Sequence, residues 1–97
     1  MTKKAYRGRC QIIAKMLSII NESEAKGATR TSVMFKAFLS HAQLKKYLSF
    51  LLVNGFIEEF PLKIKNRGNE KLVYKLTEKG LHLLQISHEI KSLAGLY

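Results

Sequence analysis

Aspartate and tryptophan are absent from this 97-residue sequence, and cysteine and proline occur once each, as Cys10 and Pro61. A single cysteine excludes an intramolecular disulfide and favours a reducing, cytoplasmic setting. The lack of aspartate removes a carboxylate that metal sites and catalytic triads often use. Because prolines are so few and 46% of the residues are apolar, the chain is expected to be ordered.

Side chains that could ligate a metal or catalyse a reaction are few and scattered. The three histidines and the cysteine stand at positions 10, 41, 82 and 88, without the spacing of a metal site. The six glycines are isolated, so the sequence has no glycine-rich phosphate-binding loop. We therefore expect a protein that is not an enzyme and that uses no metal or cofactor.

Positive charge is what the sequence has in excess. Seventeen Lys and Arg face seven acids, all Glu, for a net charge of +10. Such an excess causes self-repulsion, which a polyanionic partner relieves. Nucleic acid is the first candidate and an anionic membrane the second. The membrane is disfavoured because no apolar run approaches the roughly 20 residues of a spanning helix and because the basic residues are spread along the chain. The basic start also shows no signal-peptide pattern.

The stretch from Ser40 to Gly55 has the pattern of a helix with both ends marked. Ser40 can cap the first turn, and Asn54-Gly55 can end the last turn. An apolar stripe with spacings of three and four residues consists of Leu44, Leu48, Leu51 and Leu52. The polar side holds cations and hydrogen-bonding groups but no acid, which predicts a recognition helix for nucleic acid. Its expected DNA contacts are Ser40, His41, Gln43, Lys45, Lys46 and Ser49.

The roles of these side chains follow from their chemistry. We expect His41, Gln43 and Lys46 to reach base edges in the major groove, because glutamine suits adenine and lysine suits guanine. Lys45 and Ser49 are expected to hold phosphates. The ring of Tyr47 is expected to pack inside the protein instead of stacking on a base.

Two helices are predicted before this one. The first runs from about Arg9 to about Lys26 on an apolar stripe, after a basic arm that either reaches the phosphate backbone or only adds solubility. The second is short and is capped by Thr29 or Thr31. Together with the helix from Ser40 it forms a helix-turn-helix. Arg30 and Lys36 then lie near the groove edge, where they contact phosphates or serve only solubility.

The pattern changes to that of a β-hairpin after Gly55. A short strand covers residues 56–60, and Pro61 is expected at an edge or at a strand end. Residues 62–65 then alternate strictly, and a second strand covers residues 71–76 after a turn at 66–69. The hairpin is expected to act as a cationic wing, although lysines on a solvated hairpin could also serve only to discourage aggregation. The wing residues expected to contact DNA are Lys63, Lys65, Arg67, Asn69 and Lys71.

The last predicted element is a helix capped by Thr77. We expect Leu81 and Leu84 to cover the core. A second apolar face needs another surface to bury it, which predicts a homodimer, with docking against the first helix as the alternative. The residues expected at this interface are Leu83, Ile86, Ile90, Leu93 and Tyr97.

The predicted fold is α+β: a winged helix-turn-helix with three helices, a two-stranded hairpin wing and a C-terminal helix. Residues 1–97 form one domain, divided into the arm (1–8), the helix-turn-helix with the wing (9–76) and the dimerisation helix (77–97).

This order of elements resembles the archaeal winged helix-turn-helix DNA-binding proteins of the ArnR-like and small chromatin-protein class. The resemblance covers about residues 8–90 and is carried by four segments: I-I-A-K-M-L at 12–17, L-S-H-A-Q-L-K-K-Y-L at 39–48, L-L-V-N-G-F-I at 51–57 and Y-K-L-T-E-K-G at 74–80. It implies a winged-helix fold, double-stranded DNA as the ligand and dimerisation through the C-terminal helix. The short final helix departs from the nucleoid-type members, which have a long coiled coil.

The function expected from the sequence is double-stranded DNA binding by a homodimeric transcriptional regulator in the cytoplasm, associated with the nucleoid. A chromatin architectural protein and a protein-interaction module are the alternatives, since fold alone does not fix function. RNA binding is disfavoured because exposed aromatic pairs on a sheet are not indicated.

Overall fold

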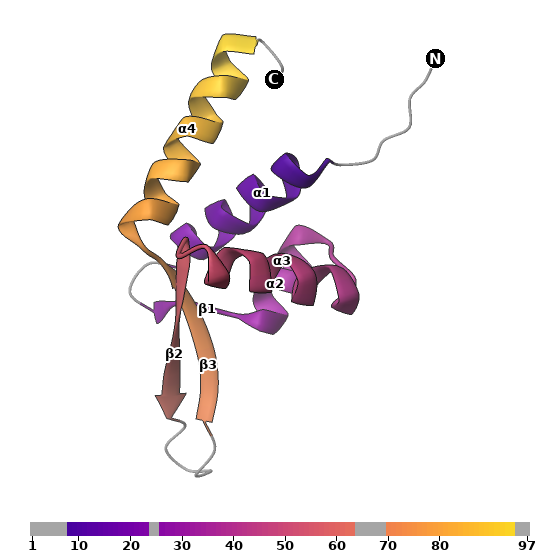
Figure 1. Cartoon of the computed structure of the whole chain (residues 1–97). Coiled ribbons are helices and arrows are strands. Elements are labelled where there is room, and N and C mark those ends of the chain that lie inside the picture. The colour runs from indigo at the N-terminus through magenta and orange to yellow at the C-terminus, as the bar shows by residue number, and fades with distance from the viewer. Residues whose placement is uncertain (1–7, 24–25, 64–69, 95–97) are drawn as a thin grey trace.

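The computed structural model describes residues 8–23, 26–63 and 70–94. Their elements follow the order α1 (Arg9–Glu22), β1 (Ala28–Thr29), α2 (Arg30–Ala37), α3 (His41–Val53), β2 (Ile57–Lys63), β3 (Glu70–Leu76) and α4 (Glu78–Ala94). Figure 1 shows α1, α2 and α3 gathered on one side of the sheet, with the β2–β3 hairpin and α4 extending in opposite directions. This is the winged-helix architecture that the sequence predicts.

The core is built where α1, α2, α3, β3 and the start of α4 meet. The largest fully buried side chains are Tyr74, Met16, Leu17, Ile20, Leu51 and Val33. The apolar stripe of α3 is buried as predicted, with Leu44 and Leu48 each 3% exposed and Leu51 fully covered. Tyr47 is also buried, as its predicted packing requires. The opposite side of α3 is therefore the side that faces solvent.

Local capping fixes where the helices begin. The Ser32 N–H donates to the Thr29 hydroxyl at 3.1 Å, which makes Thr29, not Thr31, the cap of α2. The Thr77 hydroxyl accepts from the Gly80 N–H at 3.0 Å and donates to the Gly55 carbonyl at 2.6 Å. Thr77 therefore starts α4 as predicted and also ties it to the end of α3.

The first helix is shorter than expected. It ends at Glu22 instead of about Lys26, because Ser23 caps it and the Ser23 hydroxyl donates to the Ile20 carbonyl at 2.5 Å. Gly27 then has a φ of +79°, which turns the chain toward the sheet.

The sheet has a third strand that the sequence analysis did not predict. The strand order is β1-β3-β2, so the return strand of the hairpin is central. Ala28 pairs with Tyr74, and Thr29 pairs with Val73. The predicted two-stranded wing is thus corrected to a three-stranded sheet: the hairpin of β2 and β3 is present, and β1 pairs with β3 on its other side. Pro61 lies in β2, an edge strand, where its missing N–H is tolerated as predicted.

Candidate nucleic-acid interface

The first turn of α3 is held by a reciprocal pair of hydrogen bonds. The Gln43 N–H donates to the Ser40 hydroxyl at 3.2 Å, and the Ser40 N–H donates to Oε1 of Gln43 at 3.1 Å. This capping box satisfies two N–H groups that a helix start would otherwise leave unpaired. It also gives Gln43 a structural role, because the carbonyl of its amide is used at the cap. The amide NH₂ group is not part of that cap and is the portion left for a base contact.

The other predicted side chains of α3 share its solvent side. His41, Lys45, Lys46 and Ser49 are all exposed, and α3 contains no acid. The ammonium of Lys46 lies 5.4 Å from the centroid of the Tyr47 ring, a cation–π contact that holds this ammonium over the ring. The solvent side of α3 therefore presents two ammonium groups, an imidazole and a hydroxyl with no anionic competitor on the same helix.

A second cationic position joins the start of α2 to the wing. Arg30, at the first position of α2, shares a surface hollow with Lys71 of β3. The other residues that line this hollow are Thr29, Thr31, Ser32 and Leu72. The two cations lie 41 positions apart in the sequence (71 − 30), and the pairing of β1 with β3 brings them together. The hollow thus offers two cations and three hydroxyl groups, the donors that phosphate oxygens accept from.

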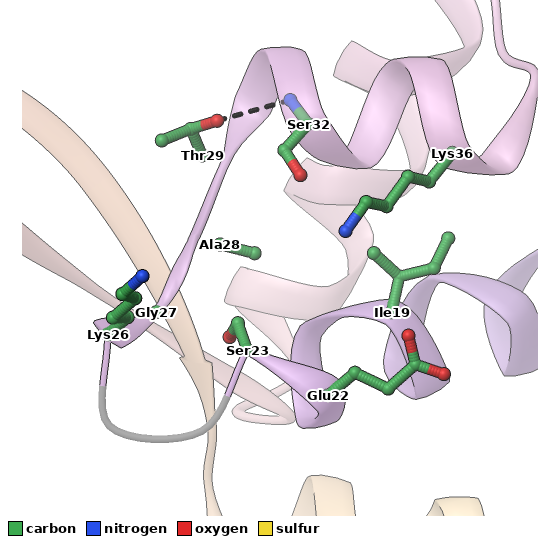
Figure 2. A pocket seen from close by; sticks show the side chains of 9 residues that line it. All are labelled: Ile19, Glu22, Ser23, Lys26, Gly27, Ala28, Thr29, Ser32 and Lys36. Atoms are coloured by element: carbon green, nitrogen blue, oxygen red, sulfur yellow. Dashed lines mark hydrogen bonds between the residues drawn. The ribbon is translucent and has the colours of Figure 1, made fainter.

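Lys36 lies on another side of α2. It lines a hollow between α1 and α2 together with Lys26, Ser32 and Glu22 (Figure 2). In that view the ammonium of Lys36 and the carboxylate of Glu22 face the same space, beside Ile19. Arg30 and Lys36, predicted as a pair at one groove edge, therefore belong to two hollows that meet at Thr29 and Ser32.

The tip of the wing falls outside the described residues. Lys65, Arg67 and Asn69 lie in residues 64–69, and for Lys63 only the backbone position at the end of β2, paired with Glu70, is described. Lys71 is exposed on β3. The predicted contribution of the tip to DNA binding therefore stays a prediction.

A buried tyrosine lies behind this surface. The Tyr74 hydroxyl donates to Oε2 of Glu59 at 2.8 Å, across the β2–β3 pair. Burial, then the hydrogen bond to Glu59 and its negative charge, raise the pKa of Tyr74 to about 12, while the charge of Arg30 acts in the opposite direction.

The side of α4 that meets the core differs in part from the prediction. Leu84 is buried as predicted, but Leu81 is 41% exposed and Leu83 packs against the core instead. Leu83, Ile86 and Ile90 face α1, which corresponds to the docking against the first helix that was the alternative to a dimer. They form an apolar groove with Cys10, Ile13, Phe50 and Phe56. The side chain of Leu93 and all of Tyr97 lie outside the described part.

Two features of this surface were not predicted. Ser32 lines both hollows beside α2, and Phe35 and Phe38 are exposed aromatic side chains at the end of that helix. The sequence gives no sign that Phe38 takes a left-handed conformation, because glycine or asparagine is the usual residue there.

Among the described residues, no group of three His, Cys or Glu side chains could hold a metal ion. None of the helices in the described ranges is long and apolar enough to cross a membrane.

The helix-turn-helix followed by a hairpin defines a winged-helix protein, and comparison with known proteins gives the same class. A family model described as "Winged helix-turn-helix" matches residues 6–95, so the chain belongs to that family. It is 34% identical over 88 residues to "Uncharacterized protein MJ0287" of the archaeon Methanocaldococcus jannaschii, covering 91% of this chain and 77% of that protein.

Solved structures agree with this assignment. The crystal structure of Sso10a-2, a DNA-binding protein from Sulfolobus solfataricus, matches with a TM-score of 0.68 and 27% identity, over 94% of this chain and 86% of that one. The MepR–DNA complex of S. aureus matches with a TM-score of 0.67 and 13% identity, over 88% of this chain and 62% of that one, and supports the fold alone. The predicted resemblance to archaeal winged helix-turn-helix proteins is thus confirmed.

Proposed function

We propose that the protein binds double-stranded DNA as a homodimer and regulates transcription, without being an enzyme. The observation that carries the proposal is the acid-free solvent side of α3, with His41, Lys45 and Lys46 exposed beyond a well-capped first turn. An α-helix fits the major groove, where these groups can reach base edges and phosphates. The DNA-binding character of Sso10a-2, which is 27% identical, supports the same ligand.

The remaining cations would position the protein on the duplex. Arg30 and Lys71, which share a hollow with three hydroxyl groups, would hold one phosphate segment between α2 and the wing. The predicted wing contacts from Lys63, Lys65, Arg67 and Asn69 would extend this toward the adjacent backbone or the minor groove. Lys36 would contact a phosphate only if the backbone passes the side of α2 that faces α1.

Regulation is favoured over DNA packaging because α3 presents base-reading groups and not cations alone. His41, the amide of Gln43 and Lys46 can distinguish base pairs, whereas an architectural protein reads mainly backbone and shape. The proposed place of action is the nucleoid in the cytoplasm. Selection from a random duplex library is expected to enrich one motif with a two-fold repeat, and enrichment of A·T content without a motif would instead support an architectural role.

The proposed dimer uses the groove between α1 and α4. The residues that line this groove, of which Cys10 is the first and Ile90 the last, include no charged side chain. Ile86 is 37% exposed and Ile90 is 57% exposed. In a chain with a net charge of +10, two copies repel each other over most of the surface. A charge-free apolar groove is therefore where a second copy can approach, and burying it removes apolar area from water.

A salt-dependent DNA titration tests the proposal. Fluorescence anisotropy of a labelled duplex should show a steep fall of affinity with salt for the wild type. Lys45→Ala should weaken binding and reduce the log–log slope by about 0.9 for the one lost phosphate contact. Lys15→Ala, which removes one exposed charge from α1, is the matched control and should change the slope by far less. Equal slopes for the two variants would contradict the assignment of α3.

A further inference from the structure

The end of α3 carries no cation of its own. None of the residues in its last turn is basic, although the carbonyls at a helix C-terminus carry partial negative charge and lack partners within the helix. The Asn54 side-chain amide donates to the Phe50 carbonyl at 2.8 Å, and the chain then turns at Gly55 with a φ of +77°. The carbonyls of Asn54, Gly55 and Phe56, which follow the last helical residue, therefore need donors from elsewhere in the fold.

The start of α4 supplies all three donors. The Lys79 ammonium donates to the Asn54 carbonyl at 2.8 Å, and the Thr77 hydroxyl donates to the Gly55 carbonyl at 2.6 Å. The Thr77 N–H donates to the Phe56 carbonyl at 3.1 Å. A cation from one helix thus stabilises the negative end of another. We name Thr77 and Lys79 the α4 clamp.

The α4 clamp adjoins the apolar groove between α1 and α4. The Lys79 ammonium also lies 4.9 Å from the centroid of the Phe56 ring, and the Phe56 carbonyl leaves no room for a Cβ at Gly80. The Phe56 ring lies 6.3 Å from the ring of Phe50, which belongs to α3. Both rings line the groove proposed for the dimer. A second copy in the groove would therefore contact a ring that the α4 clamp holds.

The contacts of the α4 clamp join two elements with different proposed roles. The solvent side of α3 carries the groups proposed to read DNA, whereas α4 supplies Ile86 and Ile90 to the groove. In a symmetric dimer, the placement of α3 relative to α4 sets the distance and the angle between the two α3 helices. Helix-turn-helix dimers bind half-sites whose spacing matches that distance. Contacts between the end of α3 and the start of α4 can therefore decide which spacing is bound.

We propose that Lys79 and Thr77 are positioning residues for DNA recognition, which hold α3 against α4 and thereby select the spacing between two half-sites. They act through the placement of α3 and not through contacts with bases. The inference rests on the proposed homodimeric DNA binding. It adds a determinant of specificity that lies outside the solvent side of α3 and outside the wing.

Lys79→Met tests the α4 clamp, because methionine keeps an apolar chain beside the Phe56 ring but has no ammonium. Thr77 is a less selective target, since its hydroxyl also caps α4. Lys79→Arg keeps the positive charge and the donor, so it is the conservative variant that should rescue the effect. Lys75→Met is the matched control, because it removes one charge from a lysine of β3 whose ammonium also lies over an aromatic ring.

The wild type and the three variants are titrated by fluorescence anisotropy with labelled duplexes of three kinds. The first is the two-fold motif obtained from the random library. The second is the same motif with two base pairs added to or removed from its centre, which rotates one half-site by about 70° around the duplex axis. The third is a single half-site. Sedimentation equilibrium and thermal unfolding are measured on the same samples.

The expected result is a narrower choice of spacing for the wild type than for Lys79→Met. The wild type should bind the selected spacing about 10-fold more tightly than the altered ones, because only the selected spacing engages both half-sites. Lys79→Met should reduce this preference by about 3-fold, the size of effect that one exposed charged contact has. Lys79→Arg and Lys75→Met should keep the preference. Lys79→Met and Lys75→Met should bind the single half-site equally, as folded dimers.

An unchanged spacing preference in Lys79→Met would overturn the proposal and leave the proposed function intact. An equal loss in Lys75→Met would assign the effect to charge alone. Weaker binding of the single half-site by Lys79→Met than by Lys75→Met would make Lys79 a DNA contact instead. A monomeric Lys79→Met would show a role in assembly only. A wild type that binds no duplex, or binds every spacing equally, would contradict the proposed homodimeric function and this inference with it.

Discussion

Tyr74 and Glu59 face each other across β2 and β3, and the tyrosine hydroxyl donates a 2.8 Å hydrogen bond to the carboxylate. Tyr74 is only 1% exposed, so its ring is buried in the core, and its hydroxyl reaches the Glu59 carboxylate on the edge strand β2. The bond connects the central strand β3 to the outer strand β2 of the wing. It is a polar contact that fixes the base of the hairpin.

This contact predicts an alkaline loss of stability. The pKa of Tyr74 is raised from 10.0 to about 12 in the folded protein, so the folded state holds the phenolic proton more tightly than the unfolded state. The resulting stabilisation is fully present below pH 10 and is lost as the pH rises from 10 to 12. Chemical denaturation at several pH values across that range should show that the free energy of unfolding falls more steeply with pH for the wild type than for Tyr74→Phe. Parallel curves for the two proteins would contradict this role of Tyr74.

The start of α4 predicts a strict requirement for glycine. A Cβ at Gly80 would collide with the Phe56 carbonyl oxygen and stand 3.0 Å from its carbon, and neither is the end of a flexible side chain. Gly80→Ala should therefore destabilise the protein by about 3 kcal/mol, at the upper end of overpacking effects. Gly8→Ala is the control, because nothing lies within 4 Å of a Cβ there. Thermal unfolding should show a large change only for Gly80→Ala.

The capping box of α3 predicts a coupled effect on stability and on binding. Ser40→Ala removes the acceptor for the Gln43 N–H and should cost about 1 kcal/mol. Because the freed first turn carries His41 and Gln43, DNA affinity should fall as well. Ser49→Ala, which alters an exposed hydroxyl of the same helix away from its start, should leave stability unchanged. Unfolding midpoints and anisotropy titrations on the same samples separate the two effects.

The proposed dimer predicts a difference between two faces of α4. Ile90→Glu places a charge in the apolar groove, and the variant should be a folded monomer because Ile90 is already 57% exposed. Leu81→Glu places the same charge nine positions earlier (90 − 81), about half a turn round the helix, and should stay dimeric. Sedimentation equilibrium distinguishes these states. A monomeric wild type, or dissociation of both variants alike, would contradict a dimer through this groove.

Helix starts could be predicted from the sequence, because capping depends on neighbouring residues. Ser40, Thr29 and Thr77 all cap the helices as their side-chain chemistry indicates. The strand β1 could not be predicted in the same way. The strand has only two residues, and Tyr74, with which it pairs, lies far along the chain, so no local pattern indicates this strand.

The side of α4 that meets the core could not be predicted from the sequence, for a different reason. Leucines at 81, 83 and 84 leave both sides of the helix apolar, so periodicity alone cannot say which side meets the core. The close approach of Gly80 to Phe56 selects the side with Leu83 and Leu84. For the candidate site, exposure of the α3 cations followed from the leucine stripe, whereas the meeting of Arg30 with Lys71 depends on the unpredicted strand.

The short strand β1 also determines how the protein can adapt to a ligand. It leads directly into α2 and pairs with the central strand, and Gly27 before it leaves no room for a side chain against Val73. The pairing of β1 with β3 therefore ties the base of the wing directly to the start of the helix-turn-helix. A duplex whose groove spacing does not match the separation of these two parts would have to bend, so the deformability of the DNA would itself contribute to target choice.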